Sequence, residues 1–240
     1  MFWLNLVSIK IKIKQGEILM KKQNPIMGDI LWGLIILLWI VMLVVQPSRE
    51  FYLEITKPQK YLSGFFNFAI LATMGDLLAG RIGIGKWTFK ITTIFKMLVW
   101  GFIGLGVTLF FGLMLNGVTA MQNANLLPFK GNNFAHAFMS AVLINISFGP
   151  AMFIFHKFTD AYIEAKYTKK PADLNSLTDR IDWKTFFKFT VLTTVPFFWI
   201  PCHTVDFLLP DEYKVLVAAF LSIALGLILS LRKKSVAKVD

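Results

Sequence analysis

Four polar side chains lie within or at the edge of long apolar segments, and they are the residues of this sequence whose types could do chemistry. They are Asp76, Asn145, His203 and Asp206. An ionised side chain at the centre of a bilayer costs at least ~2.5 kcal/mol by insertion scales, so it needs a partner or a water-filled cavity. Arg81 could reach back along its helix to Asp76, and His203 could hydrogen-bond to Asp206 three residues later. We therefore expect these residues either to line or gate a path between helices or to join helices by hydrogen bonds.

Metal chemistry is a third interpretation of the same region. His136 could join His203 and Asp206, which gives at most three candidate ligands, but structural hydrogen bonding is the favoured role. His156 ends an apolar segment, where an interfacial role is the default. Cys202 is the only cysteine, which excludes an internal disulfide. Without a nucleophile constellation, a phosphate loop or a metal-spacing motif, we expect no enzyme activity, no bound metal and no cofactor.

The elements that must position these residues are long apolar helices. Hydrophobic residues make up 56% of the 240 residues and charged residues only 16%, and the hydrophobic residues come in blocks. A membrane span needs roughly 20 apolar residues. Six segments qualify, at 30–46, 61–80, 97–115, 134–156, 189–205 and 215–231. The sequence therefore predicts an all-α, polytopic membrane helix bundle, with residues 28–240 forming one transmembrane domain.

The distribution of basic residues predicts the orientation of this bundle. Seventeen of the 25 Lys and Arg residues fall in segments on one side of the predicted spans and four on the other. Basic loops stay on the cytoplasmic side, so both termini are expected there. The net charge of +11 then indicates contact with anionic lipids at the inner face rather than nucleic acid. We expect the inner (plasma) membrane of a bacterium, or an organellar membrane if the source is eukaryotic.

The first 27 residues form a basic N-terminal arm outside the predicted spans. Two interpretations of residues 1–19 stay open. Translation could begin at Met20, which leaves these residues untranslated in the native protein, or they could form a basic amphipathic arm on the inner leaflet.

Prolines and small residues give two further patterns. Pro150, Pro196 and Pro201 remove backbone donors inside predicted spans and predict helix kinks. A stripe of small residues at intervals of four in the last span permits close helix packing. It consists of Ala218, Ser222, Gly226 and Ser230. Packing is favoured over a pore lining, and such a stripe also permits a homo-oligomer.

The C-terminal part of the chain has the order Trp199, Pro201, His203, Asp206-Phe207, Pro210, Tyr213-Lys214 and Leu229-Ser230. This order resembles the family of the peroxisomal 22-kilodalton membrane protein and the mitochondrial protein called Mpv-seventeen. Upstream, residues 74–78 look like the family's glycine-aspartate element, and Asn145 with Pro150 looks like a second family element. The family-like region covers about 61–232. It departs from the family where His203 replaces glutamine and Asp206 replaces asparagine, which turns a neutral pair into a titratable one.

This resemblance implies an organellar or bacterial inner-membrane protein without a cofactor or agreed catalytic residues. Some family members are proposed to form small nonselective channels. Our first hypothesis is therefore a multi-pass channel or carrier for small solutes, in which Asp206 takes part in the path. The alternatives are a non-transporting membrane scaffold or assembly protein, and a metal-dependent membrane enzyme.

Overall fold

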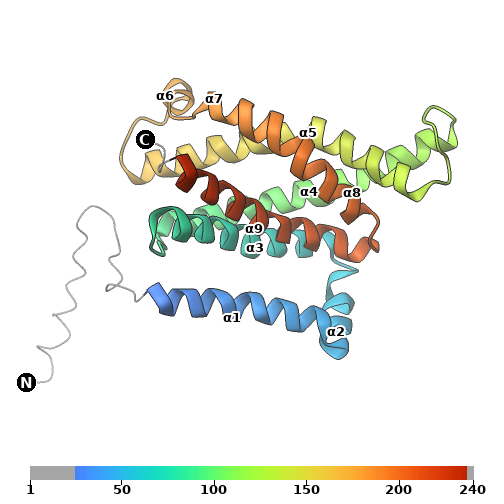
Figure 1. Cartoon of the computed structure of the whole chain (residues 1–240), viewed down its shortest axis with the longest axis horizontal. Coiled ribbons are helices and arrows are strands. Elements are labelled where there is room, and N and C mark those ends of the chain that lie inside the picture. The colour runs from blue at the N-terminus through green and yellow to red at the C-terminus, as the bar shows by residue number, and fades with distance from the viewer. Residues whose placement is uncertain (1–24, 237–240) are drawn as a thin grey trace, which may run out of the picture.

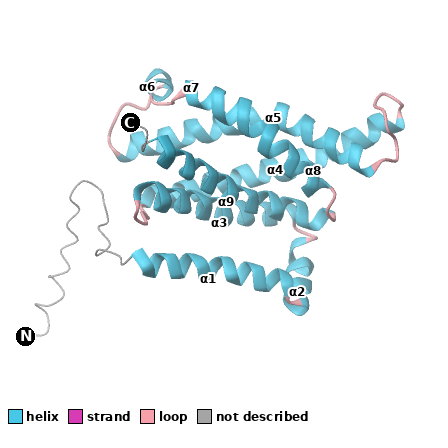
Figure 2. Cartoon of the chain, in the orientation of Figure 1, coloured by secondary structure: helices cyan, strands magenta, loops and turns pink. Residues whose placement is uncertain are grey.

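The computed structural model describes residues 25–236, and this part of the chain is helical throughout, without a strand (Figure 2). The elements are α1 (Pro25–Val44), α2 (Gln46–Thr56), α3 (Lys60–Ile84), α4 (Ile91–Asn123), α5 (Asn133–Tyr167), α6 (Leu174–Asp179), α7 (Trp183–Thr185), the π-helix η1 (Phe186–Trp199), α8 (Ile200–Phe207) and α9 (Asp211–Val236). The predicted all-α bundle is confirmed for these residues. Most of the predicted basic arm lies outside them.

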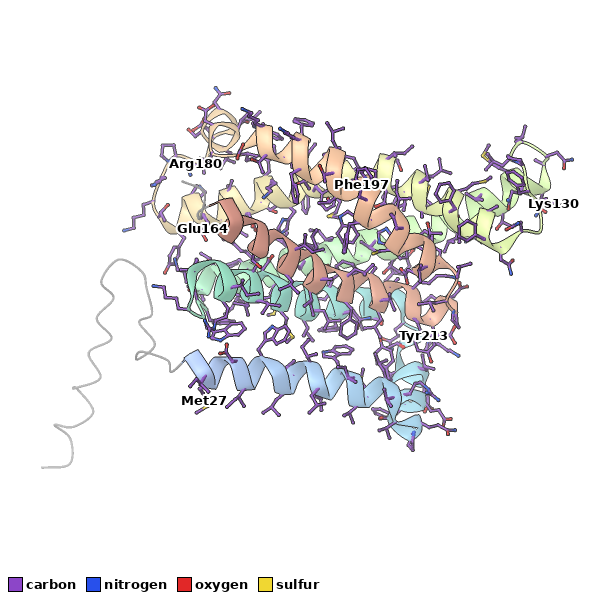
Figure 3. All side chains as sticks on the ribbon, viewed as in Figure 1. Met27, Lys130, Glu164, Arg180, Phe197 and Tyr213 are labelled. Atoms are coloured by element: carbon purple, nitrogen blue, oxygen red, sulfur yellow. The ribbon has the colours of Figure 1, made fainter. Side chains whose placement is uncertain are left out.

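The long helices run antiparallel in chain order (Figure 1). The start of α1 and the end of α9 lie at the same end of the bundle, which we call the terminal end. The opposite end carries α2 and the connection between α4 and α5, and we call it the hairpin end. Figure 3 places Glu164 and Arg180 at the terminal end and Lys130 and Tyr213 at the hairpin end.

Five of the described helical segments are long and apolar enough to cross a membrane: Ile26–Val44, Lys60–Ile84, Ile91–Asn123, Asn133–Tyr167 and Trp183–Phe207. The first has a mean hydropathy of 2.4, yet 0% of it is buried against other helices. Its exposed side chains include Leu34, Leu38 and Val44. In water such a surface would cost roughly 25 cal/mol per Å², whereas lipid accepts it. These helices are compatible with a multi-pass membrane protein.

The sixth predicted span, 215–231, lies within α9. The side chains near the end of α9 are outside the described part of the structure, and α9 is not among the five segments above. A count of six spans therefore stays a prediction.

The helices are longer than the predicted spans, and two predicted loops contain helix. α4 has 33 residues where 97–115 was expected, which gives it a length of about 50 Å against a hydrocarbon core of ~30 Å. The predicted outer loop after the first span forms α2, which has Pro47 in its first turn, where a missing N–H is tolerated. The predicted polar loop 157–183 contains the end of α5 and all of α6. Polar residues continue these helices beyond their apolar cores, so hydropathy alone underestimates their length.

Glycines let α3 approach its neighbours on two sides. A Cβ added to Gly104 of α4 would lie 2.2 Å from the Gly64 carbonyl oxygen of α3, so the two backbones are in direct contact there. On the other side, a Cβ added to Gly226 of α9 would lie 2.7 Å from the carbonyl oxygen of Gly75. Small residues at such contacts permit close packing of membrane helices. α3 is thereby held between α4 and α9.

The three predicted kink prolines occupy different local settings. Pro150 lies inside α5 and Pro196 inside η1, whereas Pro201 is in the first turn of α8. The change from π-helix to α-helix falls between Trp199 and Ile200, directly before Pro201. π-helical turns are rare and are often found at functional sites, and this segment borders the cavity described below.

Candidate functional site: a central cavity between the helices

A cavity of about 230 Å³ lies between α3, α4, α5, η1, α8 and α9, and we call it the central cavity. Three of the four predicted polar residues line it: Asp76, Asn145 and His203. Its wall runs from Phe68 to Asp76 on α3 and from Ile144 to Asp160 on α5. The cavity therefore extends along the helices rather than across them.

Asp76 does not pair with Arg81, contrary to the expectation from sequence. The guanidinium group of Arg81 binds both carboxylate oxygens of Asp29 on α1, each at 2.8 Å. The Trp87 indole N–H donates to the same carboxylate at 2.8 Å. Asp29 belongs to a different helix, so a consideration of α3 alone could not find this pairing.

The Asp76 carboxylate instead accepts a hydrogen bond from the indole N–H of Trp100 on α4, at 2.8 Å. Residues 73–75 directly before it are buried, but the Asp76 side chain is exposed. Asp76 is also one of the residues that line the central cavity. Among the residues whose side chains the structure describes, Asp76 takes part in no salt bridge of 4 Å or less.

Asn145 and His203 join α5 to α8 through a buried hydrogen bond. The Asn145 Nδ2 atom lies 2.9 Å from His203 Nδ1 and also donates to the Ala141 carbonyl at 2.8 Å. An amide nitrogen only donates, so His203 Nδ1 accepts and the imidazole is neutral in this arrangement. Phe111 of α4 contacts the imidazole edge-on, with ring centroids 5.4 Å apart.

We expect Asn145→Leu to lower the free energy of unfolding by about 1–2 kcal/mol, because it leaves His203 Nδ1 buried without a donor. Asn116→Leu is the matched control, since the Asn116 side chain is exposed and its amide donates to the Gly112 carbonyl of its own helix. Chemical unfolding of the purified protein in detergent would measure both. Equal stability of the two variants would contradict the assigned role of Asn145.

Asp206 does not bond to His203, so that expectation is wrong, and it is not among the residues that line the central cavity. Its side chain is fully buried in α8, and neither carboxylate oxygen has a hydrogen-bond partner among the described residues. Three residues of separation place the two side chains on one helix face, but His203 is turned toward Asn145 instead. Asp206 therefore serves below as a control position outside the cavity.

Charged residues gather where the central cavity approaches the terminal end. Lys96 of α4 lies 3.5 Å from both Asp160 and Glu164 of α5. His156 lies 3.8 Å from Asp160 and its ring contacts Trp100, with centroids 4.2 Å apart. The interfacial setting of His156 stays a prediction, and α5 continues eleven residues beyond it.

Two further cavities lie on either side of the central one. The terminal-end cavity, of about 690 Å³, shares Lys157, Asp160 and Thr190 with the central cavity. Its rim includes Asp182, whose pKa is held below the ordinary value by hydrogen bonds from Thr185, so it is charged at neutral pH. The central cavity and the terminal-end cavity therefore adjoin, and charged side chains lie where they meet.

The hairpin-end cavity, of about 630 Å³, lies between residues of α2, α3, α4, α5 and α9. Of the described residues that line this cavity or the central one, Phe111 alone belongs to both. Its side chain is buried and packs edge-on against Phe207 at 4.7 Å and against His203. Phe111 therefore stands between the two cavities.

The remaining predicted residues take the following places. Three members of the small-residue stripe, Ala218, Ser222 and Gly226, line the central cavity, and Gly226 also makes the close contact with α3. His136 bonds to Thr119 at 2.9 Å, away from His203. In the part of the chain that the structure describes, no group of three His, Cys, Asp or Glu side chains could hold a metal ion.

Sequence reasoning missed Trp100, Phe111 and His156 as cavity residues. Trp100 and Phe111 lie in the most uniformly apolar predicted span, where an aromatic residue gives no signal of its own. A tryptophan deep in a span does need an acceptor for its N–H, and that requirement could have pointed Trp100 toward Asp76.

Comparison with known proteins adds no relative: no family model matches the chain, and neither the curated proteins nor the solved structures contain a match. The function proposed below rests on the positions and linings of the cavities.

Proposed function

We propose that the chain is a multi-pass membrane protein that carries small solutes across the bilayer through the central cavity. The observation that supports this most is the series of three cavities along the bundle, with one side chain, Phe111, between the central and hairpin-end cavities. A hydrophobic side chain at a constriction can close a path to water and solutes. The described structure would then be a state closed toward the hairpin end.

The proposal includes six spans, with the terminal end in the cytoplasm and the membrane the inner membrane of a bacterium. The excess of basic residues at the connections of the terminal end supports this orientation. Divergent membership of the Mpv-seventeen family stays part of the proposal. A scaffold is less favoured, because helix packing alone gives no reason for an exposed carboxylate, that of Asp76, between membrane-spanning helices.

Flux through reconstituted protein tests the proposal. Vesicles that contain the purified protein should show conductance, or osmotic swelling with small charged or neutral solutes, above that of empty vesicles. Ser222→Leu should reduce this flux severalfold, because it adds apolar volume to the cavity wall. Asp206→Asn, outside the cavity, should leave it unchanged. Wild-type flux no higher than that of empty vesicles, under all voltages and solutes, would contradict transport.

A further inference from the structure

We propose that the central cavity binds a small organic cation, with the Asp76 carboxylate as its counter-ion. This inference rests on the proposed function and names its solute class. It is carried by the accessibility of Asp76, the charges around it, and the aromatic wall and size of the cavity.

Asp76 is available to a ligand. One of its oxygens accepts from the Trp100 indole N–H, its side chain is exposed, and it lines the central cavity. The guanidinium that sequence reasoning assigned to it is held by Asp29. Carboxylates within membrane spans pair with cations or face cavities, and a cationic ligand in this cavity would supply the paired charge that Asp76 lacks in the described structure.

The neighbouring charges do not fill this role. Lys96 is shared between Asp160 and Glu164, at 3.5 Å from each. Lys157 lines the mouth toward the terminal-end cavity, and its side chain is exposed there. His203, deeper in the cavity, is neutral because its Nδ1 accepts from Asn145. Lys96 and the His156 Nε2 atom lie within 4 Å of Asp160, whereas no Lys, Arg or His side chain that the structure describes lies within 4 Å of the Asp76 oxygens.

The cavity wall suits a cation that carries an apolar body. Trp100, Phe148, Phe153 and Trp199 contribute aromatic rings to it. Such rings attract cations through their faces, tryptophan most strongly. The Trp199 indole N–H is buried and has no hydrogen-bond partner among the described residues, so this ring is not committed to a protein acceptor.

The volume sets the size of the ligand. An apolar cavity of about 150 Å³ is known to hold benzene. The central cavity, at about 230 Å³, is large enough for one aromatic ring with a short aminomethyl arm. A protonated amine of this size could place its ammonium group at Asp76 and its ring against the aromatic wall.

Three ligands with one aromatic ring, similar size and different charge test the inference: benzylamine, benzyl alcohol and benzoate. Calorimetric titration of the purified full-length protein in detergent, with protein-free micelles as the blank, requires no transport. We expect benzylamine to bind at least about tenfold more tightly than benzyl alcohol, and benzoate to bind most weakly. Equal affinities for all three, or tighter binding of benzoate, would overturn the inference without the use of any variant.

Asp76→Asn then tests the counter-ion. It should weaken benzylamine binding about tenfold or more and leave benzyl alcohol binding within about twofold. Asp206→Asn, the same change outside the cavity, should alter neither. Unchanged benzylamine affinity in Asp76→Asn would refute the assignment. If benzylamine binds selectively but vesicles show no flux, the cation site is supported and the proposed transport is refuted. If vesicles show flux but the three ligands bind equally, the cation site is refuted and the proposed transport still stands.

Discussion

Phe111→Ala is expected to raise solute flux through vesicles that contain the protein at least about tenfold, because it removes the hydrophobic barrier between two cavities. Phe111 is buried, contacts His203 and Phe207, and is the side chain that the two cavities have in common. The measurement is efflux of a small solute from preloaded vesicles, compared at equal protein content.

Phe102→Ala is the matched control for this prediction. Phe102 lies on the same helix, but its side chain is 61% exposed on the outside of the bundle. Its removal should leave flux at the wild-type level. Equal flux in both variants and the wild type would mean that Phe111 does not close the route.

Gly104→Ala is expected to destabilise the protein by about 1–3 kcal/mol, the range seen for overpacked cores. The added methyl group would lie 2.2 Å from the Gly64 carbonyl oxygen, and this oxygen belongs to a helix backbone that cannot turn aside. α3 and α4 must then separate, with loss of the contacts on either side.

Gly117→Ala provides the opposite expectation on the same helix. A methyl group there meets nothing within 4 Å, so the change should be neutral or stabilise by up to about 1 kcal/mol through helix propensity. Thermal unfolding in detergent compares the two variants with the wild type. A Gly104→Ala protein as stable as Gly117→Ala would contradict the close contact between α3 and α4.

The helices were predicted from the sequence because their apolar blocks are long. A block of this length indicates a helix by its hydropathy alone, whatever the spacing of its apolar residues. Every predicted span lies almost entirely within the described helices. The ends could not be predicted, because polar residues such as those of 157–167 continue a helix as readily as they leave it. The π-helical geometry of η1 was not foreseen either, since no local residue pattern specifies it.

The candidate site was predicted in part. Asp76, Asn145 and His203 were found because a polar group in an apolar span must have a partner or a cavity. Their hydrogen-bond partners were not predicted, because tertiary packing sets them. Trp100 of α4 donates to Asp76 of α3, and Asn145 of α5 donates to His203 of α8. Phe111 was missed because a phenylalanine in an apolar span is indistinguishable from its lipid-facing neighbours until the structure orients it.

Thiol accessibility tests the central claim most directly, namely that the cavity is reached from the cytoplasm and closed by Phe111. Ser222→Cys in a Cys202→Ala background places the only thiol on the wall of the central cavity. In sealed vesicles of known orientation, we predict that a membrane-impermeant thiol reagent labels this cysteine from the cytoplasmic side and not from the other. With Phe111→Ala added, labelling should occur from both sides. A cysteine that is unreactive from the cytoplasmic side, or reactive only from the opposite side, would contradict the account.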